Sequence, residues 1–427
     1  MTDRQLHIGL CLTETWLQGR EPDDAELAEQ RQDPAGFYIK LAQAAERAKL
    51  DFVFKPDVLA MRRGKSATSP SFVGLDLTVL LAAISTATRR IGLVTTASTT
   101  FNPPYVVARQ IQSLHWVSNG RAAWNIVTSI DGAENFGDAP MPPPQERYRK
   151  AAEFTDLVRD LWQSYPHAAL DGKADAEPID HQGAFFSVKG PLNVPGHASG
   201  PPPLFQAGAS EIGRDFAACV ADATFASTPD MAAALDLRND LGARAQKHGR
   251  ADAPRVLPGL YFFLAETREE AWAMHRRAHA HLTHEKRLDA VKTILGLDIS
   301  HLPPQARVTA DLLPPDDRPV RSRTHADLLR RYIENNQPSV EDLLARPEVV
   351  GSAHWVSVGT VEDVADEIAE WFEAGAIDGF IALPGGSLES LQLFLEALVP
   401  LLVRRGIFRS DYDGETLRAH LRIRSQT

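Results

Sequence analysis

The sequence is short of cysteine, of long apolar runs and of clustered positive charge, and each shortage excludes a class of protein. Two cysteines, Cys11 and Cys219, are too few for a disulfide framework or a cysteine zinc site, and their apolar neighbours predict that both are buried. The longest apolar runs, such as VLLAAI at 79–84, fall far short of a membrane span. The chain carries 45 basic and 56 acidic residues, and the resulting formal net charge of −11 disfavours a sequence-independent grip on nucleic acid.

Two further signals are missing. The first residues, MTDRQLHIGLCLTE, lack the basic region, apolar stretch and cleavage site of a signal peptide, so we expect a cytoplasmic protein. The 14 histidines show no H-x-x-x-H or H-E-x-x-H spacing accompanied by a carboxylate, so we expect no metal site. An apolar fraction of 44% with 24% charged residues is enough for a substantial core and argues against disorder.

Short apolar runs alternate with helical patterns through most of the chain, which is typical of parallel β/α units. The expected strands cover residues 7–12, 51–57, 91–98, 121–128, 203–208, 223–227, 256–265 and 378–383. The expected helices cover residues 33–50, 75–90, 103–118, 210–221, 229–249, 267–282 and 387–405. Eight strands followed by helices favour a closed (β/α)8 TIM barrel. An open doubly wound sheet is the alternative, but no G-x-G-x-x-G motif follows any of these strands.

Two long segments interrupt this repeat. Residues 166–203 are rich in Gly and Pro with a short strand signal, and residues from about 285 to 355 separate the expected helix at 267–282 from the last strand. Loops of this length are uncommon unless they carry function. We therefore expect one barrel domain over residues 1–427, with two insertions that act as lids over a barrel mouth.

Polar residues gather where the expected strands end. In a TIM barrel the active site lies at the C-terminal ends of the strands. The stretch GRAAWNIVTS at 120–129 is one example, because a buried strand there runs directly into hydrogen-bonding side chains. The strand ends contribute Thr13 and Trp16, Asp57, residues 96–102, residues 125–129, and the GAS segment at 208–210.

The QAGAS segment at 206–210 has two interpretations. Gly208 permits a tight turn, and a helix that begins near Ser210 offers unpaired N–H groups and a positive dipole end, which together suit a phosphate. Ser210 could instead simply cap its helix, as serine frequently does. The role of Asp57 is also open, since this residue could accept hydrogen bonds from ring N–H groups or cap the next turn. The hydroxyl cluster at 95–100 could cap a turn or contact a ligand.

Several segments together resemble one family, the luciferase-like flavin monooxygenases. The nearest branch is that of nitrilotriacetate monooxygenase, pristinamycin synthase, dibenzothiophene sulfone monooxygenase and long-chain alkane monooxygenase. The resemblance runs from about residue 7 to residue 421. It is carried by TASTTFNPPYVVARQIQSLHWVSNGRAAWNIVTS at 96–129, NFG at 135–137, RYRKAAEFTDLVRDLW at 147–162, GPLNVPG at 190–196, QAGASEIG at 206–213 and VADEIAEWFEAGAIDGF at 364–380.

The resemblance implies an insertion-bearing TIM barrel that acts as a two-component monooxygenase. Its cofactor would be reduced FMN, delivered by a separate NAD(P)H:flavin reductase and used with O2 on a small organic substrate. Asp57, Thr100 and Asn125 are then expected around the isoalloxazine and ribityl chain, and Tyr148 and Ser210 at the phosphate. The resemblance also implies a homo-oligomer, a dimer or a tetramer.

One position departs from the family pattern. The family commonly has His-Asp-x-Arg-Tyr where this chain has PQERY, so Pro144 stands where a flavin-pocket histidine is expected. Proline offers no side-chain donor and removes a backbone N–H. A flavin-binding protein that does not oxygenate therefore stays open as an alternative. The resemblance also leaves open a deazaflavin-dependent oxidoreductase of the same fold, because the wider superfamily contains such enzymes.

Overall fold

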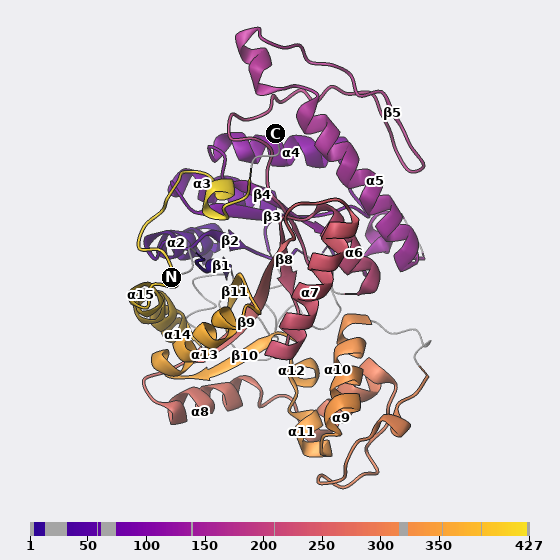
Figure 1. The fold of residues 1–427 in the computed structure, drawn as a ribbon, viewed down its shortest axis with the longest axis vertical. Helices are drawn as coiled ribbons and strands as arrows, with labels where there is room; N and C mark the ends of the chain where they lie inside the picture. The colour runs from indigo at the N-terminus through magenta and orange to yellow at the C-terminus, as the bar shows by residue number, and fades with distance from the viewer. Residues whose placement is uncertain are drawn as a thin grey trace.

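The computed structural model describes residues 4–12, 32–57, 59–60, 74–137, 140–208, 210–315, 323–351, 353–385 and 387–424. Its centre is a closed parallel barrel, seen in the middle of Figure 1, in which neighbouring strands follow the order β1-β2-β3-β4-β7-β8-β9-β11 and β11 returns to β1. The barrel strands are β1 (His7–Cys11), β2 (Phe52–Phe54), β3 (Gly92–Ser98), β4 (Ala122–Val127), β7 (Leu204–Gln206), β8 (Ala223–Ala226), β9 (Arg255–Leu264) and β11 (Gly379–Pro384). The predicted TIM barrel and all eight of its strands are confirmed.

Helices follow the strands and cover the outside of the barrel (Figure 1). They are α2 (Pro34–Arg47), α3 (Leu77–Ala87), α4 (Pro104–Val117), α5 (Pro144–Gln163), α6 (Glu211–Val220), α7 (Met231–Lys247), α8 (Arg268–Ala278), α14 (Leu388–Leu393) and α15 (Val399–Arg404). A π-helical segment, η5 (Phe394–Leu398), joins the last two, where the sequence predicted one continuous helix. Asp33 caps α2 and Asp76 caps α3 through their side-chain oxygens, which satisfies N–H groups that lack an intrahelical partner.

The strand β4 shows how the sequence separates the inside of the barrel from the outside. Side chains alternate along a strand, so neighbours point to opposite faces. Trp124 and Ile126 pack outward with Phe154 of α5, in a cluster of buried residues between barrel and helices. Ala123 packs inward with the aromatic residues that fill the barrel, and Asn125 shares its side of the strand. The alternation therefore directs the one amide of WNIV into the barrel.

A ninth strand was missed by the sequence analysis. Strand β10 (Trp355–Gly359) runs parallel to β9, with Val358 opposite Phe263, and α13 (Val361–Glu373) follows it. The strand shows the expected period of two, because Trp355, Ser357 and Gly359 are buried while the valines between them are only partly so. The assumed insertion to residue 355 concealed this β/α unit.

The first insertion is bound to the outer face of α4 and α5. It contains a 3-10 turn, η3 (His167–Asp171), and the short hairpin β5 (His181–Gln182) and β6 (Ser187–Val188). The indole N–H of Trp116 donates to the carbonyl of Pro195 at 2.7 Å, and Gln112 donates to the same carbonyl at 2.9 Å. These contacts hold the carboxyl half of the insertion against α4.

The second insertion is helical, so its description as a loop was wrong. It contains α9 (His284–Leu295), η4 (Ala310–Leu312), α10 (Arg323–Asn336), α11 (Val340–Leu344) and α12 (Pro347–Val350). Their apolar faces form a cluster of their own that includes Val291, Leu329 and Leu343. Figure 1 places these helices together at one end of the molecule, below α7. Whether either insertion acts as a lid stays a prediction, as does the single-domain boundary at 1–427.

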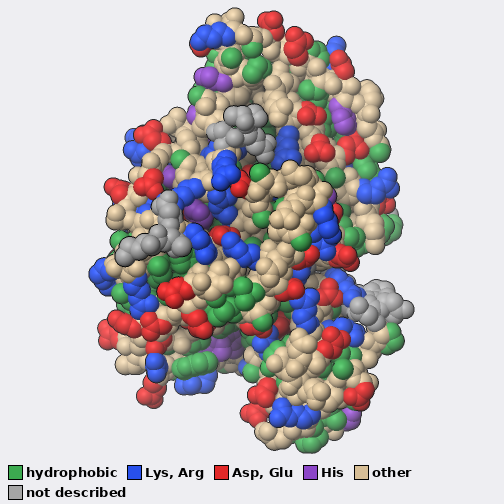
Figure 2. Space-filling view, in the orientation of Figure 1, with side chains coloured by type: hydrophobic (Ala, Val, Ile, Leu, Met, Phe, Trp, Pro, Cys, Tyr) green, Lys and Arg blue, Asp and Glu red, His purple; other side chains and the backbone are tan. Residues whose placement is uncertain are grey.

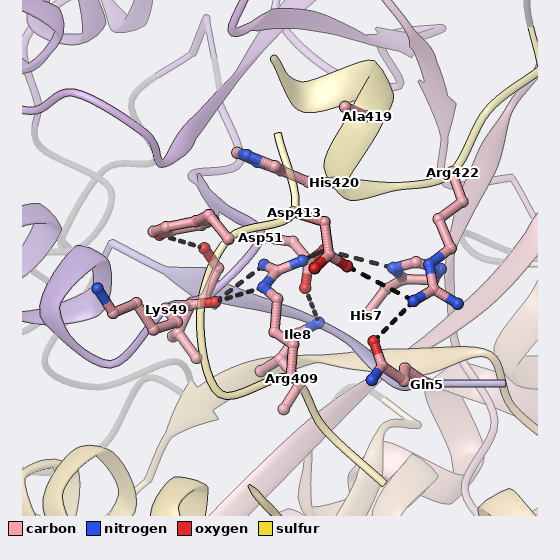
Figure 3. Close-up of polar contacts among 12 residues, drawn as sticks. Gln5, His7, Ile8, Lys49, Asp51, Arg409, Asp413, Ala419, His420 and Arg422 are labelled. Atoms are coloured by element: carbon pink, nitrogen blue, oxygen red, sulfur yellow. Dashed lines mark hydrogen bonds and ion pairs between the residues drawn. The ribbon is translucent and has the colours of Figure 1, made fainter. Parts of the chain in front are cut away.

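The C-terminal tail returns to the start of strands β1 and β2, where it makes a buried ion pair. Asp51 is fully buried and accepts hydrogen bonds from Arg409 Nη1 at 2.9 Å, from the Ile8 backbone at 2.7 Å and from His7 Nδ1 at 3.3 Å (Figure 3). The phenol of Tyr412 donates to the carbonyl of Leu50 at 2.8 Å. Burial opposes ionisation of Asp51, but the Arg409 charge and the hydrogen bonds more than offset it, so the pKa of Asp51 is lowered.

The surface corrects one cysteine prediction. Cys11 is buried in the barrel interior as expected, whereas Cys219 is exposed on α6 because its position falls on the solvent side of that helix. Acidic and basic side chains are interspersed over the face drawn in Figure 2. Among the described residues, no helix is both long and apolar enough to cross a membrane.

Candidate functional site

The site is built where the strands β3 and β4 end. Thr96 and Asn125 lie opposite each other in the register of these strands. The Asn125 amide donates to Thr96 Oγ1 at 3.1 Å, and the Thr96 hydroxyl donates to the Lys55 carbonyl at 2.9 Å. The carbonyl oxygen Oδ1 of Asn125 is buried and has no hydrogen-bond partner in the structure. Because a buried acceptor is rarely left unsatisfied, this oxygen marks a place where a ligand donor fits.

Thr100 lies at the same end of the barrel, two residues beyond the end of β3. Its hydroxyl accepts a hydrogen bond from the Ser129 N–H at 3.1 Å, and its own N–H donates to Ser98 Oγ at 3.1 Å. The hydroxyls of Ser98 and Ser129 lie 2.7 Å apart. The hydroxyl cluster therefore ties the ends of β3 and β4 together, and Lys150 of α5 adds a third contact by donating to the Thr100 carbonyl at 2.7 Å.

Tyr148 and Ser210 both approach Gly213 at the start of α6, the helix that follows β7. Ser210 is the N-cap of α6, and its hydroxyl accepts from the Gly213 N–H at 3.2 Å. A Cβ built on Gly213 would lie 2.8 Å from the Tyr148 phenol oxygen, and one on Gly208 would lie 2.5 Å from it. The two glycines therefore let the Tyr148 hydroxyl pack directly against the backbone at the start of α6, and we call this group of Tyr148, Gly208, Ser210 and Gly213 the cradle.

The remaining predicted residues are placed less fully. Asp57 follows β2 by three residues at the same barrel end and is partly exposed. Pro144 is the first residue of α5, where its missing N–H costs no helical hydrogen bond. Thr13 and Trp16 lie outside the described residues. The structure thus places Asn125 on β4 and Thr100 just beyond β3 at the same end of the barrel, and it places Tyr148 and Ser210 on either side of Gly213 at the start of α6.

The sequence analysis missed three residues at this end of the barrel, where the strands end. Thr228, two residues beyond β8, is buried and its hydroxyl has no hydrogen-bond partner in the structure. Gln206 ends β7, and its Oε1 accepts from the Gly208 N–H at 2.7 Å, which fixes the turn before α6. Arg147 bonds the Ser129 carbonyl through Nη1 while its buried Nε has no partner. A search for polar residues within two positions of every strand end would have found Thr228 and Gln206.

Electrostatics at this end is dominated by cations of α5. Burial lowers the pKa of Arg147, with the neighbouring Tyr148 acting in the opposite direction. Arginine nevertheless stays protonated at any physiological pH. Helix α6 adds the positive end of its dipole to the same region. The arrangement suits an anionic group.

Comparisons with known proteins show the family of the chain. The family model described as luciferase-like monooxygenase matches residues 15–378, which is most of the chain. The chain belongs to this family. It is 36% identical over 410 residues to nitrilotriacetate monooxygenase component A from Aminobacter aminovorans, covering 90% of this chain and 89% of that protein. The family prediction from the sequence motifs is therefore confirmed.

Two solved structures share the whole architecture. EDTA monooxygenase (EmoA) from Chelativorans sp. BNC1 superposes with a TM-score of 0.82 at 28% identity, covering 99% of each chain. Riboflavin lyase (RcaE), solved with modified FMN and riboflavin, gives a TM-score of 0.78 at 29% identity, covering 98% of this chain and 95% of that one. The chain is thus a flavin-dependent oxidoreductase of the monooxygenase class.

Proposed function

We propose that the protein is the oxygenase component of a two-component system, which uses reduced FMN and O2 to oxidise a small organic substrate. A separate NAD(P)H:flavin reductase would supply the reduced FMN. The similarity to a protein named as component A of a monooxygenase supports the two-component arrangement. A neighbour solved with modified FMN supports the choice of flavin. A homo-oligomeric state stays a prediction from the resemblance.

The observation that carries this proposal is the cradle at α6. FMN ends in a phosphate, and the described residues offer at one point a helix N-terminus, the hydroxyl of Ser210, and the hydroxyl of Tyr148, which packs against the backbone of two glycines. The unsatisfied Oδ1 of Asn125 and hydroxyl of Thr228 provide polar partners at the strand ends, where the ring system would lie. The residues present therefore fit a flavin mononucleotide.

Each group then has a defined role. Tyr148 and Ser210 bind the phosphate, while Asn125, Thr100 and Asp57 contact the isoalloxazine and ribityl chain. Bound reduced flavin supplies the electrons that activate O2. The apolar residues that fill the barrel below, including Phe225 and Tyr261, exclude water from the floor of the site.

Replacing each phosphate ligand tests the proposal. Ser210→Ala and Tyr148→Phe should each weaken FMN binding by roughly one to two powers of ten, because a lost hydrogen bond to a charged group costs about 1.5–3 kcal/mol. Riboflavin lacks the phosphate, so its affinity should not change. Ser210→Ala should also lose about 1 kcal/mol of stability from the cap seen in the structure.

The decisive quantity is the ratio of the FMN and riboflavin dissociation constants. Thr267→Ala is a matched control, since Thr267 caps α8 in the same way and stands outside the cradle. It should lose stability without changing this ratio. If neither cradle variant narrows the preference for FMN over riboflavin, the phosphate assignment is wrong.

A second candidate, a flavin-binding protein that does not oxygenate, is favoured by Pro144 alone. At the start of α5 this residue can donate no hydrogen bond. With reduced FMN and O2 supplied, an oxygenase forms product that depends on substrate and releases less peroxide than the flavin consumed. Peroxide equal to the flavin consumed, across a panel of amines, sulfur heterocycles and polyaminocarboxylates, would favour the second candidate.

A further inference from the structure

A pocket lies beside the proposed flavin site. It has a volume of about 420 Å³ and lies between the start of α5 and the loop of the β5–β6 hairpin. Thr100 belongs to its wall, so the pocket adjoins the strand end at which we place the flavin ring. The pocket lining also includes Arg147, Lys150, Phe185 and Phe186.

The pocket contains two cations that lack acidic partners. Lys150 donates to the Thr100 carbonyl, and Arg147 donates to the Ser129 carbonyl, but neither forms an ion pair with any described residue. The Nε of Arg147 is buried without any hydrogen-bond partner. A buried donor on a charged group is costly to leave unsatisfied. Glu146 is the one acidic side chain among the pocket's lining residues, and it is exposed.

The carboxylate of Glu153 could have neutralised Lys150, but it already accepts hydrogen bonds from other groups. Glu153 lies three residues further along α5 and accepts N–H groups from residues 184, 185 and 186, at 2.9–3.2 Å, and from His181 at 3.1 Å. Burial raises the pKa of Glu153, but these bonds outweigh it and lower the pKa overall. Glu153 thus fixes the hairpin loop, and it leaves the Lys150 charge uncompensated.

The fixed loop provides the apolar wall. The Lys150 ammonium lies 5.7 Å from the ring centre of Phe186, and the guanidinium of Arg149 lies 5.8 Å from that of Phe185. Of these two cations only Lys150 lines the pocket, and an ammonium beside an aromatic ring there suits a negatively charged organic group, because the ring excludes water and strengthens the charge interaction.

We propose that this pocket binds a carboxylate group of the substrate, with Lys150 and Arg147 as specificity-determining residues. The proposal rests on the proposed function, since it assumes that Thr100 adjoins the flavin ring. Arginine binds a carboxylate through a planar fork of donors, and lysine adds a point charge. An anchored carboxylate would hold the remainder of the substrate toward the flavin.

Titration calorimetry with succinate and iminodiacetate tests the proposal directly. The wild-type protein should bind both anions more tightly than their diamides, and added salt should weaken the binding because charges are screened. Lys150→Met and Arg147→Met should each raise the dissociation constants about ten-fold or more. Arg149→Gln is the matched control, because this cation lies on the same turn but outside the pocket lining, and it should leave the constants unchanged.

Each other outcome overturns the proposal. Equal affinity for anions and diamides, or anion binding that survives Lys150→Met, shows that the pocket does not select carboxylates. Should Lys150→Met instead narrow the preference for FMN over riboflavin, the pocket belongs to the cofactor. If Lys150→Met does not fold, Lys150→Gln and the salt dependence of the wild type give the same decision. The FMN titration is independent of these measurements, so the failure of the proposed function can be distinguished.

Discussion

The phenol oxygen of Tyr148 stands so close to Gly208 that a methyl group on the glycine would lie 2.5 Å from it. The first prediction follows from this closeness. Gly208→Ala forces Tyr148 or the turn before α6 to move, because Gln206 Nε2 would also lie 2.4 Å from the new atom. We expect FMN affinity to fall at least ten-fold, with a smaller loss for riboflavin, as measured by fluorescence titration.

Gly242→Ala in α7 is the control for this substitution. A Cβ at Gly242 meets nothing within 4 Å, so alanine should be neutral or stabilise the helix by about 0.5–1 kcal/mol. Its FMN affinity should equal that of the wild type. A Gly208→Ala protein that folds and binds FMN normally would show that the cradle does not hold the phosphate.

The second prediction concerns Asn125, which is expected to contact the ring or ribityl part of the flavin. Asn125→Ala removes the buried Oδ1 and the hydrogen bond to Thr96. FMN and riboflavin affinities should therefore both fall about ten-fold, and their ratio should stay constant. Gln112→Ala controls for the loss of a buried amide, since Gln112 also has an unpartnered Oε1 but lies on the outer helix α4. A changed ratio would place Asn125 at the phosphate instead.

The third prediction concerns the ion pair between Asp51 and Arg409 (Figure 3). Asp51→Asn leaves the arginine buried without a counter-charge, so the free energy of unfolding at pH 7 should fall by about 3–5 kcal/mol. Asp411→Asn is the control, because its ion pair with Lys49 is exposed and screened by solvent, so its loss should change the free energy of unfolding far less. Urea unfolding followed by circular dichroism measures both.

The same pair gives a pH dependence with a definite sign. The pKa of Asp51 is lower in the folded state than in the unfolded chain, so its stabilisation is complete above the unfolded value of about 3.9 and is lost as pH falls through the folded value. The stability difference between wild type and Asp51→Asn should be constant from pH 5 to 7 and shrink in stronger acid. A difference that grows on acidification would contradict the assignment.

The sequence predicted the barrel well because its signals are local. Apolar runs such as 91–98 and 256–265 are each followed by a helix, and the period-two burial of strand β4 directs Asn125 inward without any knowledge of distant contacts. Their place at strand ends made candidates of Asp57, Thr100, Asn125 and Ser210, whereas Tyr148 and the flavin roles came from the family resemblance. Tertiary contacts could not be predicted in this way, because nothing local in the sequence links Arg409 to Asp51 or Glu153 to the hairpin loop.

The errors have the same origin. Strand β10 has the alternation of a strand, but it was counted within a long insertion because the insertion was defined by what did not fit an eight-fold repeat. Cys219 was expected in the core from its apolar neighbours, yet a helix has two faces and its position falls on the exposed one. Pocket residues such as Lys150 carry no local signal, because the pocket needs the hairpin loop.

The last prediction uses His115, a buried residue that joins α4 to the first insertion. Its Nε2 lies 3.1 Å from Ser199 Oγ and 3.1 Å from the Gly200 carbonyl. Burial first, and then the nearby His197, lower the pKa of His115 to about 3, so the ring is neutral in the folded protein. Its stabilisation is complete above the unfolded value of about 6.5, and it declines as pH falls toward 3, since the unfolded chain then binds a proton that the folded chain excludes.

The wild-type protein should therefore lose stability below pH 6.5 at up to about 1.4 kcal/mol per pH unit from this group. His115→Gln should be less stable at pH 7.5, because the contact with the insertion is weakened, but its stability should fall less steeply between pH 6.5 and 4.5. His301→Gln, at an exposed side chain, is the matched control. Urea titrations at pH 7.5, 6.0 and 4.5 give the slopes, and equal slopes for wild type and His115→Gln would show that His115 accepts its proton in the folded state.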